Sequence, residues 1–233
     1  SHKITKGKKG VMGTAERRKR ERQQRMNEIL TAAAELVFTM GIHETSMDQI
    51  ADKAELSKGT LYLYFQNKSD LLAGLCNRGL NKLKSMFETV MQEKKTGAEQ
   101  LEAIGKEYLR FAEQDRDYYE LMLYCMADTH SGAHELEPQA DACHQTGMSI
   151  HKITAIAIEN GIQDKTIHTS FDPMELAVLM WGQTTGVIQI IQQNKDELQN
   201  VFHVNTNRMI EIYFQLVRNS LRNIAVDSRE EET

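Results

Sequence analysis

The side chains best suited to bind a ligand lie between residues 45 and 68. They are amines, hydroxyls and phenols, which can hydrogen-bond to phosphate oxygens or base edges, beside one glycine that lets the backbone come close to a partner. Such groups act together when one face of a helix presents them to a nucleic-acid groove. The candidate residues for this chemistry are Thr45, Ser46, Lys58, Gly59, Thr60, Tyr62, Tyr64 and Lys68.

Two short helices joined by a tight turn are predicted to position these groups. The first begins after Ser46, whose hydroxyl can cap it, and carries apolar residues at helical spacing. Ser57 can cap a second helix over residues 58–65, in which Leu61 and Phe65 point inward. This is the layout of a DNA-reading helix-turn-helix, in which the second helix enters the major groove. One of the two tyrosines of this helix is expected to be partly buried, and the sequence leaves open which.

A specific string of residues surrounds this pair of helices. After a helix that ends at Met40-Gly41 come TSMDQIA at 45–51, Ala54, LSKGTLYLYF at 56–65, Asn67-Lys68 and Leu71-Leu72. This string resembles the tetracycline-repressor (TetR) family of bacterial transcriptional regulators. The resemblance implies that the candidate residues above contact DNA, that the body of the chain binds a small molecule, and that the long helix after the reading unit transmits this binding to DNA affinity.

Composition favours an all-α fold. The chain has 233 residues, of which 40% are hydrophobic, only two prolines, and almost no alternating β-branched runs. We expect an N-terminal three-helix helix-turn-helix domain followed by a C-terminal helical ligand-binding and dimerisation domain. The expected boundaries are a basic arm at 1–24, the DNA-binding domain at 25–72, and the ligand-binding and dimerisation domain at 73–233.

Positive charge is concentrated in the N-terminal part. Residues 1–72 carry 13 Lys or Arg and nine Asp or Glu, whereas the other 161 residues carry 15 and 24. A basic end on an acidic body suggests that a polyanion binds at one end only. Helix formers at 15–25 can extend a helix predicted at 25–40, and this basic segment is expected to contact DNA phosphates through Arg17, Arg18 and Arg20. The alternative is a solvated tail that aids solubility.

Cysteine usage and hydropathy indicate the compartment. Cys76, Cys125 and Cys143 are odd in number and scattered without metal-binding spacing, which fits a reduced cytoplasm. The resemblance to bacterial regulators implies a bacterial cytoplasm and a place at the nucleoid. No apolar run is long enough to cross a bilayer, and the basic start is not followed by the apolar segment of a signal peptide. No membrane partner is therefore expected.

The rest of the chain reads as a series of helices. They are predicted at 68–91, from a capping box at Thr96, around 118–126, at 140–160 with a stop at Gly161, from Asp172-Pro173, and at 206–224, with a loop at 127–139. The last two helices, about 172–194 and 206–224, are strongly apolar, and the family dimerises through its last two helices. A homodimer through these helices is therefore expected, because two half-sites need two reading units.

A small-molecule pocket is expected in the core of the body. The candidates for its lining are Tyr108, Phe111, Tyr118, Met122, Met126, Met148, Met180, Trp181 and Thr184. The alternative is that these side chains are plain core, which is the commoner use of Met and aromatic residues at helical spacing. No cluster of buried charges is evident, so the unknown inducer is expected to be a small apolar or aromatic molecule, and no cofactor is expected.

One polar group suggests a metal site as a weaker alternative. It comprises His130, His134, Glu135, Glu137, Asp141, Cys143, His144 and His151. The stretch reads mainly as a loop and lacks the second histidine of a zincin motif, so no metal is expected.

The favoured function is a ligand-responsive DNA-binding transcriptional regulator, a repressor that binds a pseudo-palindromic operator as a dimer and is released by a small-molecule inducer. A rival is an interaction protein whose basic helix binds RNA or an anionic membrane. An enzyme is the weakest reading, because the sequence has no Gly-rich phosphate loop, no GxSxG and no recognisable metal motif.

Overall fold

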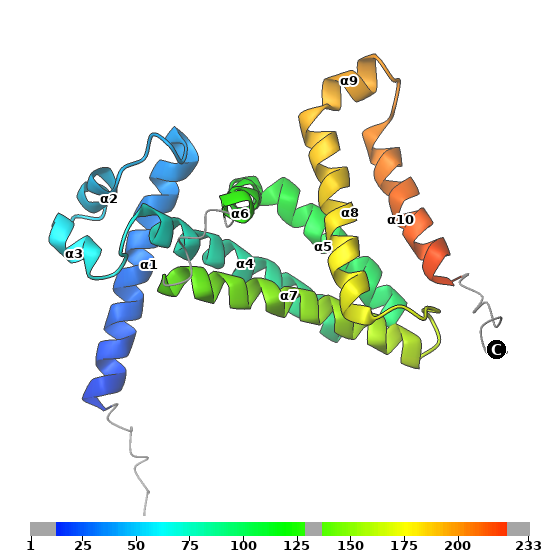
Figure 1. Cartoon of the computed structure of the whole chain (residues 1–233), viewed down its shortest axis with the longest axis horizontal. Coiled ribbons are helices and arrows are strands. Elements are labelled where there is room, and N and C mark those ends of the chain that lie inside the picture. The colour runs from blue at the N-terminus through cyan, green and yellow to red at the C-terminus, as the bar shows by residue number, and fades with distance from the viewer. Residues whose placement is uncertain (1–12, 129–136, 223–233) are drawn as a thin grey trace, which may run out of the picture. The chain divides into compact units, whose positions relative to one another are not determined.

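A computed structural model describes residues 13–128 and 137–222, and all regular secondary structure within them is helical (Figure 1). This confirms the predicted all-α fold. The chain divides into two compact units, Ser1–Leu75 and Cys76–Thr233. Helix α4 (Lys68–Glu93) contributes to both units, because the division falls within it.

In its described part, residues 13–75, the first unit consists of three helices and the start of α4. They are α1 (Thr14–Met40), α2 (Met47–Lys53) and α3 (Lys58–Tyr62). Helix α1 continues through the basic segment, as its helix formers predicted, and ends at Gly41, which has a positive φ of 94°. The buried core of this unit is formed by Ile29, Ala33, Val37, Ile50, Ala51, Leu61, Phe65, Leu71 and Leu75.

Helix α3 is shorter than the predicted helix at 58–65. After Tyr62 the backbone tightens, since the amide of Leu63 donates to the carbonyl of Thr60 and that of Tyr64 donates to Leu61. Bonds to the third residue back are typical of a helix end that winds into a turn. Phe65 is nevertheless fully buried, as its inward position predicted.

Over residues 76–128 and 137–222, the second unit contains most of α4 and six further helices. These are α5 (Gly97–Gln114), α6 (Arg116–Asp128), α7 (Pro138–Gln163), α8 (Pro173–Gln193), α9 (Lys195–Asn200) and α10 (Thr206–Arg222). Helix α7 packs against α5 and α8, and α6 packs against α5. The core between them includes Tyr108, Phe111, Tyr119, Ile158 and Ile188.

A close crossing of α5 and α7 corrects the predicted end of α7. A Cβ at Gly97 would lie 1.9 Å from the backbone nitrogen of Gly161, so α5 tolerates no side chain at the crossing, and a Cβ at Gly161 would meet the Ile167 side chain at 2.5 Å. Gly161 therefore serves packing and not termination, and α7 continues to Gln163. The crossing is also tied by a carboxylate oxygen of Asp164, which accepts a 2.8 Å hydrogen bond from the Gly97 amide.

The predicted loop at 127–139 is shorter at both ends. Its first two residues belong to α6 and Pro138 starts α7, as suits a residue with a fixed φ. Residues 129–136 lie outside the described part of the chain. Helix α9 was not predicted, because five of its six residues are polar and its one leucine gives no apolar periodicity.

Helices α8 and α10 lie side by side and are joined through α9 at one end (Figure 1). Asp172 caps α8 by accepting from the amides of Met174 and Glu175. Several large apolar side chains on these helices remain exposed, among them Leu179 at 56% and Leu216 at 63%. Among the described residues, no helix is both long enough and apolar enough to span a membrane.

Candidate nucleic-acid interface and ligand pocket

The first turn of α3 is fixed by the Ser57 cap and faces solvent. The Ser57 hydroxyl accepts the Thr60 amide at 3.1 Å and lies 2.7 Å from the Thr60 hydroxyl. Lys58 and Gly59 are exposed next to this cap, and a Cβ at Gly59 would meet nothing within 4 Å. Three of the predicted contact residues are thus presented together at the helix start, two fully and Thr60 in part.

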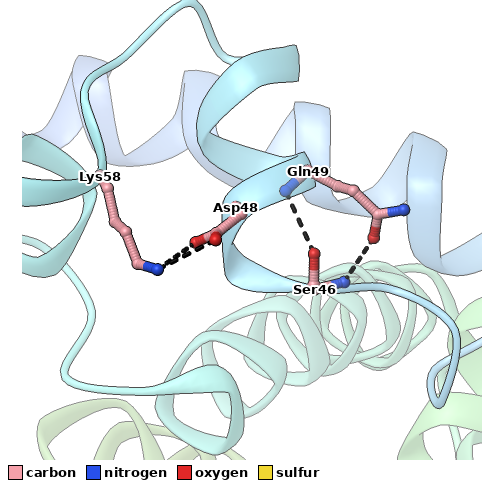
Figure 2. Close-up of polar contacts among 4 residues, drawn as sticks. All are labelled: Ser46, Asp48, Gln49 and Lys58. Atoms are coloured by element: carbon pink, nitrogen blue, oxygen red, sulfur yellow. Dashed lines mark hydrogen bonds and ion pairs between the residues drawn. The ribbon is translucent and has the colours of Figure 1, made fainter.

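Lys58 is paired with a carboxylate of the neighbouring helix (Figure 2). Its amine lies 2.7 Å and 2.9 Å from the two carboxylate oxygens of Asp48 on α2. The hydrogen bond and charge of Asp48 raise the pKa of Lys58, so the amine is charged at neutral pH. Both side chains are exposed, and exposed ion pairs are weak. Lys58 can therefore exchange this carboxylate for a phosphate at little cost.

The start of α2 is built by a capping box. The Ser46 hydroxyl accepts the Gln49 amide, and the Gln49 side chain accepts the Ser46 amide at 2.7 Å (Figure 2). Thr45 departs from its predicted role, because its side chain is only 1% exposed and its hydroxyl donates to the carbonyl of Gly41. The Thr45 side chain thus holds the α1–α2 turn and is not available to a phosphate.

The two tyrosines of the reading unit have different environments. Tyr62 is 43% exposed, whereas Tyr64 is half-buried beneath Arg22 of α1. The guanidinium carbon of Arg22 lies 4.9 Å from the centre of the Tyr64 ring, and its Nη2 donates to the Leu63 carbonyl at 3.0 Å. Arg22 therefore fastens α1 to the end of α3. Sequence reasoning missed this role because no local spacing links two residues so far apart in the chain.

Lys68 also makes a contact within the protein. Its amine donates to the His43 carbonyl of the α1–α2 turn at 3.4 Å, and its side chain is half-buried. The adjacent helix start is fixed by Asn67, whose side chain accepts the Asp70 amide, and by buried Asp70, which accepts the Gln66 amide. These bonds set the direction of the chain between α3 and α4.

The predicted basic contacts on α1 lie on the exposed helical extension. Arg17, Arg18 and Arg20 are all exposed, and Arg17 pairs with Glu21 one turn later at 3.5 Å. An exposed pair between residues four apart leaves the arginine free to reorient. Residues 1–12 of the predicted arm lie outside the described chain.

A pocket of about 210 Å³ lies between α5, α8 and α10. Of the nine predicted ligand-binding residues, it brings together two, Met180 and Thr184. Its other walls come mainly from α5 and α10. The sequence did not predict them, because the apolar residues of the last helix were assigned to the dimer interface. They include Leu101, Gly105, Tyr213, Phe214, Val217 and Leu221.

The lining of this pocket also contains an ion pair. Arg218 of α10 lies 2.9 Å from a carboxylate oxygen of Glu102 on α5, and both residues line the pocket. The pKa of Glu102 is lowered, first by its hydrogen bond with Lys106 and further by Arg218. The pocket therefore combines apolar walls with four charged side chains, Glu99, Glu102, Arg218 and Arg222, of which Arg218 is already paired with Glu102.

The other seven predicted ligand residues do not line this pocket. Phe111 and Met122 are buried in the core, and Tyr118 packs against Gly79 of α4. Met126 and Met148 are exposed, since their helical faces turn toward solvent. Trp181 instead meets the ring of His151 edge-on, with 5.2 Å between ring centres.

Tyr108 belongs to a buried polar group beside the pocket. Its hydroxyl lies 2.9 Å from that of Thr185, and burial raises its pKa. Its ring meets Tyr119 edge-on at 6.0 Å, and burial likewise raises the pKa of Tyr119. The pocket residue Thr184 continues the network through a 2.8 Å contact with the hydroxyl of Tyr213. Helices α5, α8 and α10 are thus linked by hydroxyl pairs at the pocket.

The suggested metal group is only partly covered by the structure. His130, His134 and Glu135 lie outside the described residues. Within the described residues, no three His, Cys, Asp or Glu side chains are arranged to hold a metal ion.

Comparison with known proteins matches this architecture. The sequence model for bacterial regulatory proteins of the tetR family matches residues 29–75. The chain is 31% identical over 101 residues to the HTH-type transcriptional activator FasR of Mycolicibacterium smegmatis, covering 43% of this chain and 46% of FasR. It is 32% identical over 82 residues to the fatty acid metabolism regulator protein of Bacillus subtilis, covering 35% and 42%. The aligned part thus spans less than half the length of these curated relatives.

A solved structure extends the likeness of the fold to the body. The transcriptional regulator FadR from Bacillus subtilis, in complex with stearoyl-CoA, superposes with a TM-score of 0.63 at 19% identity and covers 82% of this chain and 96% of that one. At this low sequence identity, the superposition supports a shared fold alone. The helix-turn-helix geometry and the match at residues 29–75 thus make the N-terminal unit similar to bacterial regulatory proteins of the tetR family.

Proposed function

We propose that the chain is a homodimeric repressor that binds a pseudo-palindromic operator through α2 and α3 of each copy and leaves it when a small apolar molecule of the fatty-acyl class enters the body. The observation that carries the DNA-binding half is the first turn of α3. There, an exposed amine, an open glycine and an exposed phenol lie on one short helix whose start is fixed by Ser57. These groups suit a major-groove contact flanked by phosphates.

The proposed dimer uses α8 and α10. Both carry large apolar side chains that are exposed in the single chain, including Val178 and Leu179 on α8 and Ile212 and Leu216 on α10. Pairing with a second copy removes this apolar surface from water and gives two reading units related by symmetry. Two such units suit an operator with two half-sites about one DNA turn apart.

Two kinds of observation support a ligand of the fatty-acyl class. A relative is named for fatty acid metabolism, and a solved protein of the same fold is described in complex with stearoyl-CoA. In this chain the pocket has apolar walls, and Arg218 offers a positive charge for an anionic head group. Because Arg218 is paired with Glu102, an anionic head group would have to replace that carboxylate.

Ligand entry requires movement of α10. The pocket holds about 210 Å³, whereas pockets for drug-sized ligands usually measure about 300–1,000 Å³. A long acyl chain must therefore push α10 away from α5 and α8. Since α10 is also a proposed dimer helix, this shift changes how two copies pair and hence the distance between their reading helices. A ligand that favours the shifted state weakens DNA binding.

The direction of regulation depends on where the operator lies. FasR of Mycolicibacterium smegmatis is named as an activator, so the same type of reading unit occurs in activators. Repression is proposed here because release of DNA by a ligand is the simplest outcome of the α10 shift.

The test is a fluorescence-anisotropy titration of the full chain on a duplex that carries its inverted repeat. We expect stearoyl-CoA to release the DNA, and Met180→Trp, which fills the pocket, to bind DNA normally but to resist release. Met148→Trp is the matched control, because Met148 is exposed and does not line the pocket. Equal release from both variants, or none from the unmodified chain, would contradict the proposed ligand site. Binding to RNA or anionic vesicles in place of duplex DNA would support the rival reading.

A further inference from the structure

The first turns of α1 contain few interactions that would keep them helical on their own. We call residues 14–25 the basic extension. All of them are exposed, and Gly13 before the helix supplies no side-chain cap. The ion pairs of Arg17 with Glu21 and of Arg25 with Glu28 stay within the helix, and exposed pairs of this kind are weak. Helical order in the basic extension therefore depends on the rest of α1 and on contacts with other helices.

Arg22 makes such a contact with the end of α3. Its Nη2 donates to the Leu63 carbonyl at 3.0 Å, and its guanidinium carbon lies 4.9 Å from the centre of the Tyr64 ring. The last carbonyls of a helix lack partners within the helix, and positive charge near them is favourable. A planar guanidinium suits both contacts, because its edge donates hydrogen bonds while its face covers the ring. Arg22 thus joins the basic extension to the reading helix.

Other basic residues lie next to this contact. Arg18 and Lys19 precede Arg22 by four and three residues, which are the spacings of side chains on one helix face. The same face continues toward the core through Met26 and the fully buried Ile29. The basic extension projects beyond α2 and α3 (Figure 1). The face of α1 that meets α3 is therefore also the face that carries Arg18 and Lys19.

The contact is made beside the exposed surface of the reading helix. Tyr62 and Leu63 are 43% and 69% exposed, and Arg22 holds the carbonyl of Leu63. A reading helix in a major groove has phosphates on both sides of it. Basic side chains within one turn of its end can reach these phosphates, provided that the helix which carries them keeps its direction.

We propose that Arg22 is a positioning residue, which holds the basic extension at the end of α3 so that Arg18 and Lys19 contact DNA phosphates beside the reading helix. The proposal rests on the proposed function, because it requires that α3 reads DNA. A loose basic arm loses conformational entropy when DNA orders it, and this loss weakens binding. With Arg22 in place, the segment is ordered before DNA arrives.

The first experiment measures the affinity of the full chain for the duplex that carries its inverted repeat, at salt concentrations between about 50 and 200 mM. Each phosphate contact adds about 0.9 to the steepness of log affinity against log salt. Arg22→Ala should remove the equivalent of about two to three contacts per copy, more than its own charge explains. Arg25→Ala is the matched control, because Arg25 is an exposed arginine of the same helix, and it should remove about one contact at most.

Two substitutions of Tyr64 separate the positioning role from the charge of Arg22. Tyr64→Leu removes the ring and Tyr64→Phe keeps it, whereas both lack the hydroxyl and retain every basic residue. We expect Tyr64→Leu to bind about fivefold more weakly than Tyr64→Phe and to show a salt dependence smaller by about one to two contacts. Equal salt dependence in the two Tyr64 variants, or a loss of about one contact or less in Arg22→Ala, would overturn the proposal.

Hydrogen exchange of the chain without DNA tests the positioning role by itself. The amides of residues 18–21 should exchange about fivefold faster in Arg22→Ala and in Tyr64→Leu than in the unmodified chain, whereas Arg25→Ala should leave their exchange unchanged. Equal exchange in all of these proteins would show that Arg22 does not order the basic extension, and the proposal would fail. If the unmodified chain binds no duplex DNA, the proposed function fails, while hydrogen exchange still decides whether Arg22 holds the extension.

Discussion

The two units of the chain use glycine in opposite ways. Gly59 lies in the first turn of α3, after the Ser57 cap, and a Cβ added there would meet nothing within 4 Å. Gly97 lies in the first turn of α5, after the Thr96 cap, and a Cβ there would lie 1.9 Å from the backbone nitrogen of Gly161. The body needs its glycine in order to pack, whereas the space at Gly59 is open to an external partner. Substitutions in the two units should therefore separate stability from binding.

The largest effect is expected from Gly97→Ala. The new methyl group collides with backbone, which cannot rotate away as a side chain can, so we expect the free energy of unfolding to fall by about 3 kcal/mol. Urea denaturation followed by circular dichroism measures this loss. Gly147→Ala is the control, because Gly147 lies inside α7 with nothing within 4 Å of its added Cβ. If both variants were equally stable, the claim that the body needs Gly97 in order to pack would be contradicted.

The second effect is on DNA binding and involves Lys58 and Tyr62. Each side chain is exposed on α3, and loss of both should weaken binding to the selected duplex about a hundredfold while the melting temperature is retained. Anisotropy titration of Lys58→Ala/Tyr62→Ala tests this. Lys53→Ala is the matched control, since Lys53 is an exposed lysine of α2 that pairs with Glu35 of α1 at 2.7 Å. An unchanged affinity in the folded double variant would contradict the assignment of α3 as the reading helix.

Gly59→Ala sharpens the comparison most directly. Alanine is the better helix former, so the free energy of unfolding should stay the same or rise by up to about 1 kcal/mol. If the backbone at Gly59 approaches DNA closely, the same variant should bind about tenfold more weakly, which corresponds to about 1.4 kcal/mol. The free energy of unfolding and the DNA affinity of this variant are measured on the same preparation and compared with those of the unmodified chain. An unchanged DNA affinity would show that DNA does not approach the backbone at Gly59 closely.

A smaller effect of opposite sign is expected from Asp48→Asn. The substitution removes a negative charge near the proposed phosphate contacts and releases Lys58 from its ion pair. DNA binding should tighten by about two- to fivefold, and the gain should shrink as salt rises because exposed charges are screened. Titrations at two salt concentrations measure this. Weaker binding would show that Asp48 itself helps to position Lys58.

The smallest effect concerns pH and the body. Burial lowers the pKa of His151, whose ring meets Trp181 edge-on. Because the folded pKa lies below the unfolded value of about 6.5, the unfolded chain binds the proton first, and stability falls as pH drops below that value toward the folded pKa. The melting temperature of the unmodified chain should therefore fall more between about pH 7.5 and 5.5 than that of His151→Gln. An identical decrease would show that His151 carries none of the pH dependence.

The sequence predicts the DNA-binding unit more fully than the body for a physical reason. Its caps at Ser46 and Ser57 and its inward Leu61 and Phe65 are encoded within a few residues of each other, so spacing alone identifies them. The exceptions involve distant partners. Burial of Thr45 depends on the whole turn after α1, and the end of α3 is held by a residue of α1.

The body depends on contacts that local patterns do not encode. Its helix starts at Thr96 and Asp172 follow from capping chemistry, but the crossing at Gly161 reads in the sequence as a helix stop. The pocket draws residues from three helices. Spacing along one helix cannot show which neighbour that helix meets, and for this reason seven of the nine predicted ligand residues do not line the pocket between α5, α8 and α10.

The most direct test of the central claim is selection of bound sequences from a random duplex DNA library by the full chain at moderate salt. If α2 and α3 of two copies read DNA, the retained sequences share an inverted repeat, and Lys58→Ala/Tyr62→Ala fails to enrich it. Retention that is blind to sequence, sensitive to salt and equal in the two proteins would contradict the account.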